Sequence, residues 1–136
     1  MSFGENIAPL VGRCMIAALF ILSAIGKLQH WNDAAMSMAE HGVRAIGPLL
    51  ALAIVIELGA GFGLMIGFRT RLLALVLFAF TLAVSFIMHD FWAIEDAELA
   101  RAQTVLFTKN MAIAGGLLIL VGLGAGRWSY DNWRGD

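Results

Sequence analysis

Six charged or polar side chains interrupt the long apolar stretches of this chain, and their types suit hydrogen bonding and proton transfer. Glu57 lies about ten residues into an apolar run, roughly 15 Å along a helix that rises 1.5 Å per residue. A charge at that depth in a membrane costs about 2.5–3.5 kcal/mol on insertion scales, so it needs a partner or a function. The full set is Arg13, Lys27, Glu57, His89, Lys109 and Asn110.

One chemistry that such a set serves is the binding of a quinone, which has two carbonyl oxygens and an apolar tail. His89, Lys109 and Asn110 offer hydrogen-bond donors, and Glu57 offers a path for protons. The spacing alone does not distinguish a quinone from another small amphiphile.

A purely structural role is the alternative for the same residues. Glu57 can form a buried ion pair with Arg13 or Lys109 that fixes the register of the helices. Lys27 can extend to the lipid head groups, and His89 can be an interface residue. The three histidines have no metal-ligand spacing, so the sequence predicts no metal site; they are His30, His41 and His89.

The composition indicates a membrane protein. The 136 residues are 60% hydrophobic and 14% charged, whereas soluble domains are about 25% charged. A soluble globule of this size buries only about 60–70% of its surface and could not hide so much apolar area. A soluble enzyme is therefore disfavoured. The net charge of −1 provides no basic face, so no nucleic-acid partner is expected.

Four apolar runs are long enough to cross a bilayer as helices, at residues 7–28, 47–67, 72–89 and 105–124. They do not alternate polar and apolar residues as barrel strands do, so we expect an all-α bundle of four membrane-spanning helices in a single domain. Residues 29–46 predict a short amphipathic helix between the first two spans, with Trp31 at the interface. The first run is expected to be a retained span rather than a cleaved signal.

Four spans place both termini on one side of the membrane, together with the short link at residues 68–71. Four arginines lie on that side and two lie in the loops opposite, which favours cytoplasmic termini: Arg69, Arg71, Arg127 and Arg134 against Arg44 and Arg101. The same topology brings Lys27, His89, Lys109 and Asn110 together in the outer half of the bundle. Glu57 is then beneath them, and Arg13 is on its far side.

Glycines at four-residue spacing predict close helix packing, either within the bundle or in a homodimer. They are Gly59, Gly63 and Gly67 in the second span, and Gly122 and Gly126 near the end of the fourth.

Four segments of the chain resemble the DoxX family of small four-helix membrane proteins, along nearly the whole length: "GRCMIAALFILSAIGKLQHW", "IELGAGFGLMIGFRTRLLAL", "MHDFW" and "FTKNMAIAGGLLILVGLGAGRWSYD". The six polar residues named above resemble the family pattern too. The resemblance implies a redox or quinone context, because the founding name belongs to a subunit associated with an archaeal quinol oxidase and thiosulfate:quinone oxidoreductase. It supplies no catalytic residue, and further cofactors would have to come from other subunits.

The first functional hypothesis is therefore a subunit of a quinone-linked oxidoreductase system in the cell inner membrane, in contact with the lipid bilayer, quinone and other redox subunits. One alternative is a non-enzymatic membrane scaffold for soluble proteins. A less favoured one is a small transporter that forms its path as a dimer. The sequence does not decide whether the chain has catalytic activity of its own.

Overall fold

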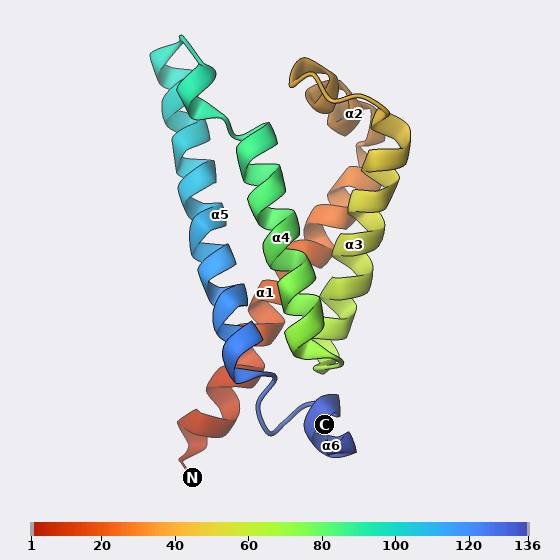
Figure 1. Cartoon of the computed structure of the whole chain (residues 1–136), viewed down its shortest axis with the longest axis vertical. Helices are drawn as coiled ribbons and strands as arrows, with labels where there is room; N and C mark the ends of the chain where they lie inside the picture. Colours follow the sequence, from red (N-terminus) through yellow and green to blue (C-terminus); the bar gives the residue numbers. More distant parts are fainter. Residues whose placement is uncertain (1, 136) are drawn as a thin grey trace.

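Four long helices dominate the computed structural model, which describes residues 2–135. They are α1 (Phe3–Gln29), α3 (Ile46–Ile66), α4 (Thr70–Met88) and α5 (Ala97–Leu123). Each is long and apolar enough to cross a membrane, and no strand occurs within the described range. The predicted all-α, four-helix architecture is confirmed (Figure 1).

The first and last long helices begin earlier than the apolar runs, because polar residues cap them outside the apolar part. α1 begins at Phe3 rather than at residue 7, since Ser2 and Glu5 form a reciprocal capping box. α5 begins at Ala97 rather than at residue 105, and the side chain of Asp96 caps its first turn. The eight added residues extend α5 by about 12 Å.

Short helices occupy the connections. The amphipathic segment predicted between the first two spans forms α2 (Trp31–Glu40), which crosses one end of α1 and α3 (Figure 1). A 3₁₀ turn, η1 (Phe91–Ala93), separates α4 from α5, and α6 (Tyr130–Arg134) follows the last span.

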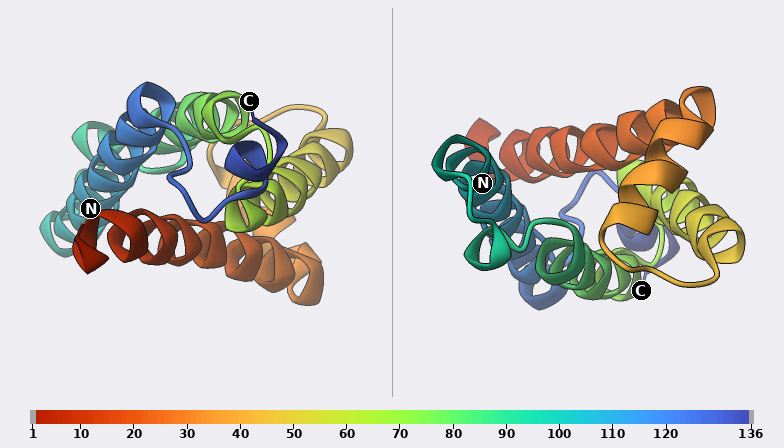
Figure 2. Two further views of the ribbon diagram at one scale, coloured as in Figure 1. Left: turned by 90° about the horizontal axis from the view of Figure 1, so that it is seen from below. Right: turned by 90° about the horizontal axis from the view of Figure 1, so that it is seen from above.

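The link between α3 and α4 is only three residues long, so these helices form the expected antiparallel hairpin. Gly67 in this link has a φ of 74°, a left-handed conformation that suits glycine. Around the bundle α1 packs on α3, α3 on α4, and α4 on α5. Both ends of the described chain lie with this link at one end of the bundle, and residues 124–129 cross its base (Figure 2, left).

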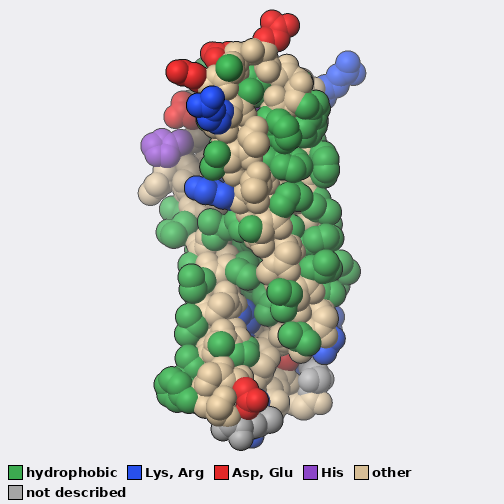
Figure 3. Space-filling model, turned by 90° about the vertical axis from the view of Figure 1, so that its left-hand side faces the viewer, with side chains coloured by type: hydrophobic (Ala, Val, Ile, Leu, Met, Phe, Trp, Pro, Cys, Tyr) green, Lys and Arg blue, Asp and Glu red, His purple; other side chains and the backbone are tan. Residues whose placement is uncertain are grey.

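The core is divided between two clusters along the bundle. The larger one includes Phe20, Leu64, Leu77 and Leu117, and a smaller one near α2 contains Ala24, Leu50 and Ile54. Many other large apolar side chains point outward on all four long helices. Figure 3 shows them over the middle of one face, with acidic side chains towards the two ends. This distribution fits a chain that is surrounded by lipid.

Candidate functional site

Glu57 is a buried carboxylate near the middle of α3, with only 3% of its surface exposed. Its two oxygens accept hydrogen bonds from Lys27 Nζ of α1 at 2.9 and 3.0 Å. Ser23 Oγ accepts a third bond from the same Nζ at 2.7 Å and donates to Glu57 Oε1 at 3.3 Å. Ser23 and Lys27 are four residues apart and so share one face of α1. Ammonium, hydroxyl and carboxylate therefore form a closed triangle.

The ion pair of Glu57 has a different partner from the two that the sequence suggested. It is Lys27, rather than Arg13 or Lys109, that neutralises the carboxylate. Packing of α1 on α3 sets this choice, because it brings the last turns of α1 against the middle of α3. The Lys27 side chain remains 28% exposed, whereas that of Glu57 is 4% exposed. The pair is therefore buried on the carboxylate side and accessible on the ammonium side.

A cavity of about 220 Å³ adjoins the pair and receives side chains from all four long helices. Its polar lining comes from Ser23, Lys27, Glu57, Thr81, His89 and Asn110. Its apolar lining comes from Leu19, Phe20, Phe80, Val84 and Ile113. The cavity is thus an apolar space with polar groups on several sides, which is the usual construction of a small-molecule site.

Two of the polar groups in this cavity have hydrogen-bonding capacity left over. The Oγ1 atom of Thr81 is buried without a partner in the described chain, and the residue is only 4% exposed. Within residues 2–135 the structure likewise gives the Asn110 side chain no bond. Buried polar groups are nearly always hydrogen-bonded, so the Thr81 hydroxyl is available to a polar atom that enters the cavity.

His89 is held in place by the long helix on the other side of the cavity. Its Nδ1 lies 2.7 Å from Gln103 Oε1 of α5. An amide oxygen can only accept, so this contact places a proton on Nδ1 and leaves Nε2 as an acceptor in the neutral ring. His89 Nε2 can therefore accept a hydrogen bond from a hydroxyl when the ring is neutral, and it can donate one when the ring is charged.

An apolar groove of about 440 Å³ continues from the cavity under α2. The groove and the cavity share Lys27, Phe80, Val84 and His89 as lining residues. The rest of the groove is almost entirely apolar and comes from α2, α3 and α4, as with Met38, Leu50 and Ile87. A molecule with a polar head and an apolar tail could occupy both spaces at once.

Two of the six residues singled out in the sequence lie away from this cavity. Lys109 is exposed on α5, although its neighbour Asn110 lines the cavity. Arg13 is 2% exposed near the opposite end, where Nη1 donates to Ala125 O and Nη2 donates to Trp128 O at 3.0 Å and to Met65 O at 3.3 Å. Arg13 thus fastens the segment after α5 to the end of α3.

Two hydroxyl groups of the site were missed in the sequence. Ser23 lies one helical turn before Lys27, and Thr81 is one of two hydroxyl residues in the third apolar span, the other being Ser85. Small polar residues inside predicted spans were the signal that could have identified them, because a membrane offers them no water. The sequence had drawn attention only to the larger polar groups.

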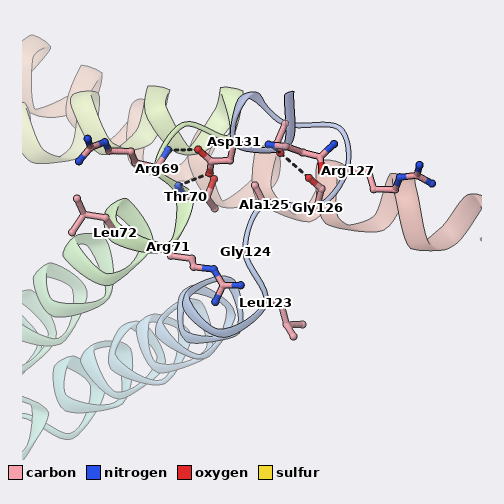
Figure 4. A pocket seen from close by; sticks show the side chains of 12 residues that line it. Arg69, Thr70, Arg71, Leu72, Leu123, Gly124, Ala125, Gly126, Arg127 and Asp131 are labelled. Carbon is pink, nitrogen blue, oxygen red and sulfur yellow. Dashed lines mark hydrogen bonds between the residues drawn. The ribbon is translucent and has the colours of Figure 1, made fainter. Parts of the chain in front are cut away.

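A larger hollow, of about 590 Å³, lies at the terminal end, between the start of α4 and the segment after α5 (Figure 4). It is lined by arginines and open to the outside, so it is less suited to chemistry that must exclude water. No group of three or more His, Cys, Asp or Glu side chains that could hold a metal occurs within residues 2–135.

Comparison with known proteins gave a family model and two relatives that are named as inner membrane proteins. The family model described as DoxX matches residues 8–90. The chain is 34% identical to "Inner membrane protein YqjF" of Escherichia coli K12, over 93% of the chain and 92% of that protein. It is 32% identical to "Inner membrane protein YphA" of the same organism, over 90% of the chain and 86% of that protein. Comparison with solved structures gave no match.

Proposed function

The chain belongs to the DoxX family of integral membrane proteins, and from that premise we propose that it is an inner-membrane subunit of a quinone-linked oxidoreductase system. The proposed role of its polar cavity is to bind the quinone head group. The observation that carries the proposal is the joining of a polar cavity between four helices to an apolar groove.

The lining residues fit a head group with two carbonyl oxygens. The Thr81 hydroxyl of α4 and the Asn110 amide of α5 are donors on different sides of the cavity, and the Thr81 hydroxyl has no other partner in the described chain. Phe20 and Phe80 provide flat apolar walls. The cavity alone is smaller than the ~300–1,000 Å³ of typical ligand sites, but the adjoining groove supplies room for an apolar tail.

A bound quinone would supply two-electron, two-proton chemistry, with the electrons delivered by a partner subunit. The chain's own residues would hold the head group and move protons to it. Lys27 connects the buried Glu57 carboxylate with the more exposed end of the bundle, and Ser23 bridges the two groups. A proton taken up at the exposed side can therefore reach Glu57 without leaving a charge unpaired in the apolar interior.

Binding of a quinone analogue to the purified protein in lipid nanodiscs tests this proposal. Glu57→Gln should weaken binding by about tenfold or more, because it removes the charge that orients Lys27. Thr81→Val keeps the shape of the side chain but removes the hydroxyl, and it should weaken binding by about fivefold. Lys109→Ala is the matched control, since Lys109 is exposed outside the cavity, and it should bind as the wild type does.

The proposal fails if the wild type binds no analogue, or if the two cavity variants bind as tightly as the control. Thermal stability in the same nanodiscs separates a loss of binding from a loss of fold. A soluble protein that copurifies with a wild-type chain unable to bind analogue would favour a scaffold role instead.

A further inference from the structure

The hollow at the terminal end of the bundle is lined by more arginines than carboxylates. It lies between the start of α4, the end of α5 and residues 124–129, and it measures about 590 Å³. Its lining contains three arginines and one carboxylate: Arg69, Arg71 and Arg127 with Asp131. Figure 4 shows the Arg71 guanidinium beside Gly124, whereas the side chains of Arg69 and Arg127 extend outward on opposite sides of the space.

The single carboxylate of this lining is already bound by backbone N–H groups. Asp131 Oδ1 accepts from the Arg69 N–H at 2.6 Å, and Oδ2 accepts from the Thr70 N–H at 2.8 Å. Asp131 thereby caps the first turn of α4, as the dashed lines in Figure 4 show. It forms no ion pair with the arginine side chains of the hollow within the described chain.

The Arg71 guanidinium is held in position by only one of its three nitrogen atoms. Its Nη1 donates to Val121 O at 3.2 Å and to Gly122 O at 2.7 Å, so the guanidinium is fastened to the last turn of α5. Gly124 lies beside it with a φ of 84°, and a Cβ there would be 3.3 Å from Arg71 Nε. The Nε and Nη2 groups of Arg71 and the whole guanidinium of Arg69 have no acceptor among residues 2–135.

Exposed apolar side chains border the same hollow. Leu72 and Leu123 belong to its lining, and they are 50% and 79% exposed. Both lie at the ends of membrane-spanning helices, where lipid head groups meet acyl chains. A ligand of this hollow therefore meets guanidinium groups and apolar surface together.

We propose that the hollow binds the phosphate group of an anionic phospholipid, with the acyl chains against Leu72 and Leu123. Guanidinium groups bind phosphate oxygens through paired N–H donors, and basic pockets at the ends of membrane helices hold such head groups. A free phosphate ion would use the same arginines but not the two leucines, and this favours the lipid as the source.

Native mass spectrometry of the full-length protein tests the site. The protein is released from nanodiscs of phosphatidylcholine alone, or of an equal mixture with phosphatidylglycerol. The wild type should retain phosphatidylglycerol in preference, and Arg69→Gln should reduce that preference by about fivefold. Adding Arg71→Gln should reduce it by about fivefold again. Arg101→Gln removes the same charge at the other end of α5 and should leave the preference unchanged.

Three results would overturn the proposal: no preference in the wild type, an unchanged preference in Arg69→Gln, or an equal loss in Arg101→Gln. Because the Arg69 side chain has no acceptor in the described chain, Arg69→Gln should fold normally, and a thermal melt checks this. In a separate arm the protein is incubated with inorganic phosphate alone. Tight binding of phosphate, with no preference among lipids, would show that the ligand is the free ion.

Discussion

Each half of this bundle buries a charged side chain, and the two charges are neutralised in opposite ways. At the terminal end, α1 contributes Arg13, whose guanidinium donates to three backbone carbonyls. In the other half, α3 contributes Glu57, which is paired with the ammonium group of Lys27. One charge is therefore bound by the chain's own backbone, and the other by a second side chain.

The packing around the two buried charges also differs. Beside Arg13 the backbone packs tightly: a Cβ on Gly67 would lie 3.1 Å from the guanidinium and 2.5 Å from Ser129 Cβ, although Arg13 Nε has no partner in the described chain. Beside Glu57 there is a cavity, and the buried hydroxyl of Thr81 has no partner in the described chain. The comparison indicates that Arg13 holds the fold together through its three carbonyl acceptors. The Glu57 pair instead faces a cavity that a ligand can enter.

The largest effect on stability is expected from Arg13→Met. The change keeps much of the side-chain volume but leaves three carbonyls without their donor, one of them buried and two partly buried, at a cost of roughly 3–5 kcal/mol in the free energy of unfolding. Chemical denaturation of the protein in detergent measures this cost, with the exposed Arg44→Met as the control. Equal stability of the two variants would show that Arg13 does not hold the fold together. A loss of analogue binding in Arg13→Met would further contradict the contrast between Arg13 and Glu57.

A smaller effect is expected from Asp131→Asn, which removes the charged cap of α4. Partial burial would raise the pKa of Asp131, but hydrogen bonds from Thr70 and Arg69 outweigh it and hold the pKa below its ordinary value. Its contribution is therefore present above pH ~3.9, the ordinary pKa, and is lost as the pH falls through the lower pKa of the folded state.

The wild type should exceed the Asp131→Asn variant by about 1 kcal/mol at neutral pH. Thermal melts over a pH series measure the difference, which should shrink once the pH falls below about 4. A difference that remains constant down to the lowest pH would show that the charge of Asp131 does not stabilise the terminal end of the bundle.

The smallest effect on stability is expected when Lys27 and Glu57 are both replaced by apolar residues. Lys27→Met with Glu57→Leu should change the free energy of unfolding by only about 1 kcal/mol, since burying two charges costs nearly as much as their attraction returns. Analogue binding should nevertheless be lost. Lys27→Met alone should be the less stable variant, because it leaves a buried carboxylate unpaired. A large loss of stability in the double variant would make this pair structural, as Arg13 is.

The fold was largely predictable because apolar runs of membrane length leave the backbone few alternatives to a helix. The hairpin followed from the short link after α3, and α2 followed from its amphipathic pattern. The early start of α5 did not follow, because residues 97–104 are polar and hydropathy detects only the part of a helix that lies in lipid. The cap at Asp96 marks that start better than hydropathy does.

The candidate site was predictable in composition but not in pairing. Four of the six residues reach one cavity, because the topology brings their helix segments to the same half of the bundle. The rotation of each helix about its axis decided the rest: it turns Asn110 inward and its neighbour Lys109 outward. It also turns Lys27 to Glu57. Such rotations follow from the packing of small residues, as where Gly61 meets Ile21, and a single sequence does not reveal them.

The bonds of Arg13 also bear on how this protein is made. Arg13 leaves the ribosome in the first span, whereas its acceptors at Ala125 and Trp128 follow more than a hundred residues later. Until those carbonyls arrive, the guanidinium has to remain where water or lipid phosphate can solvate it. Arg13 can therefore complete its set of three bonds only after the last span has been synthesised.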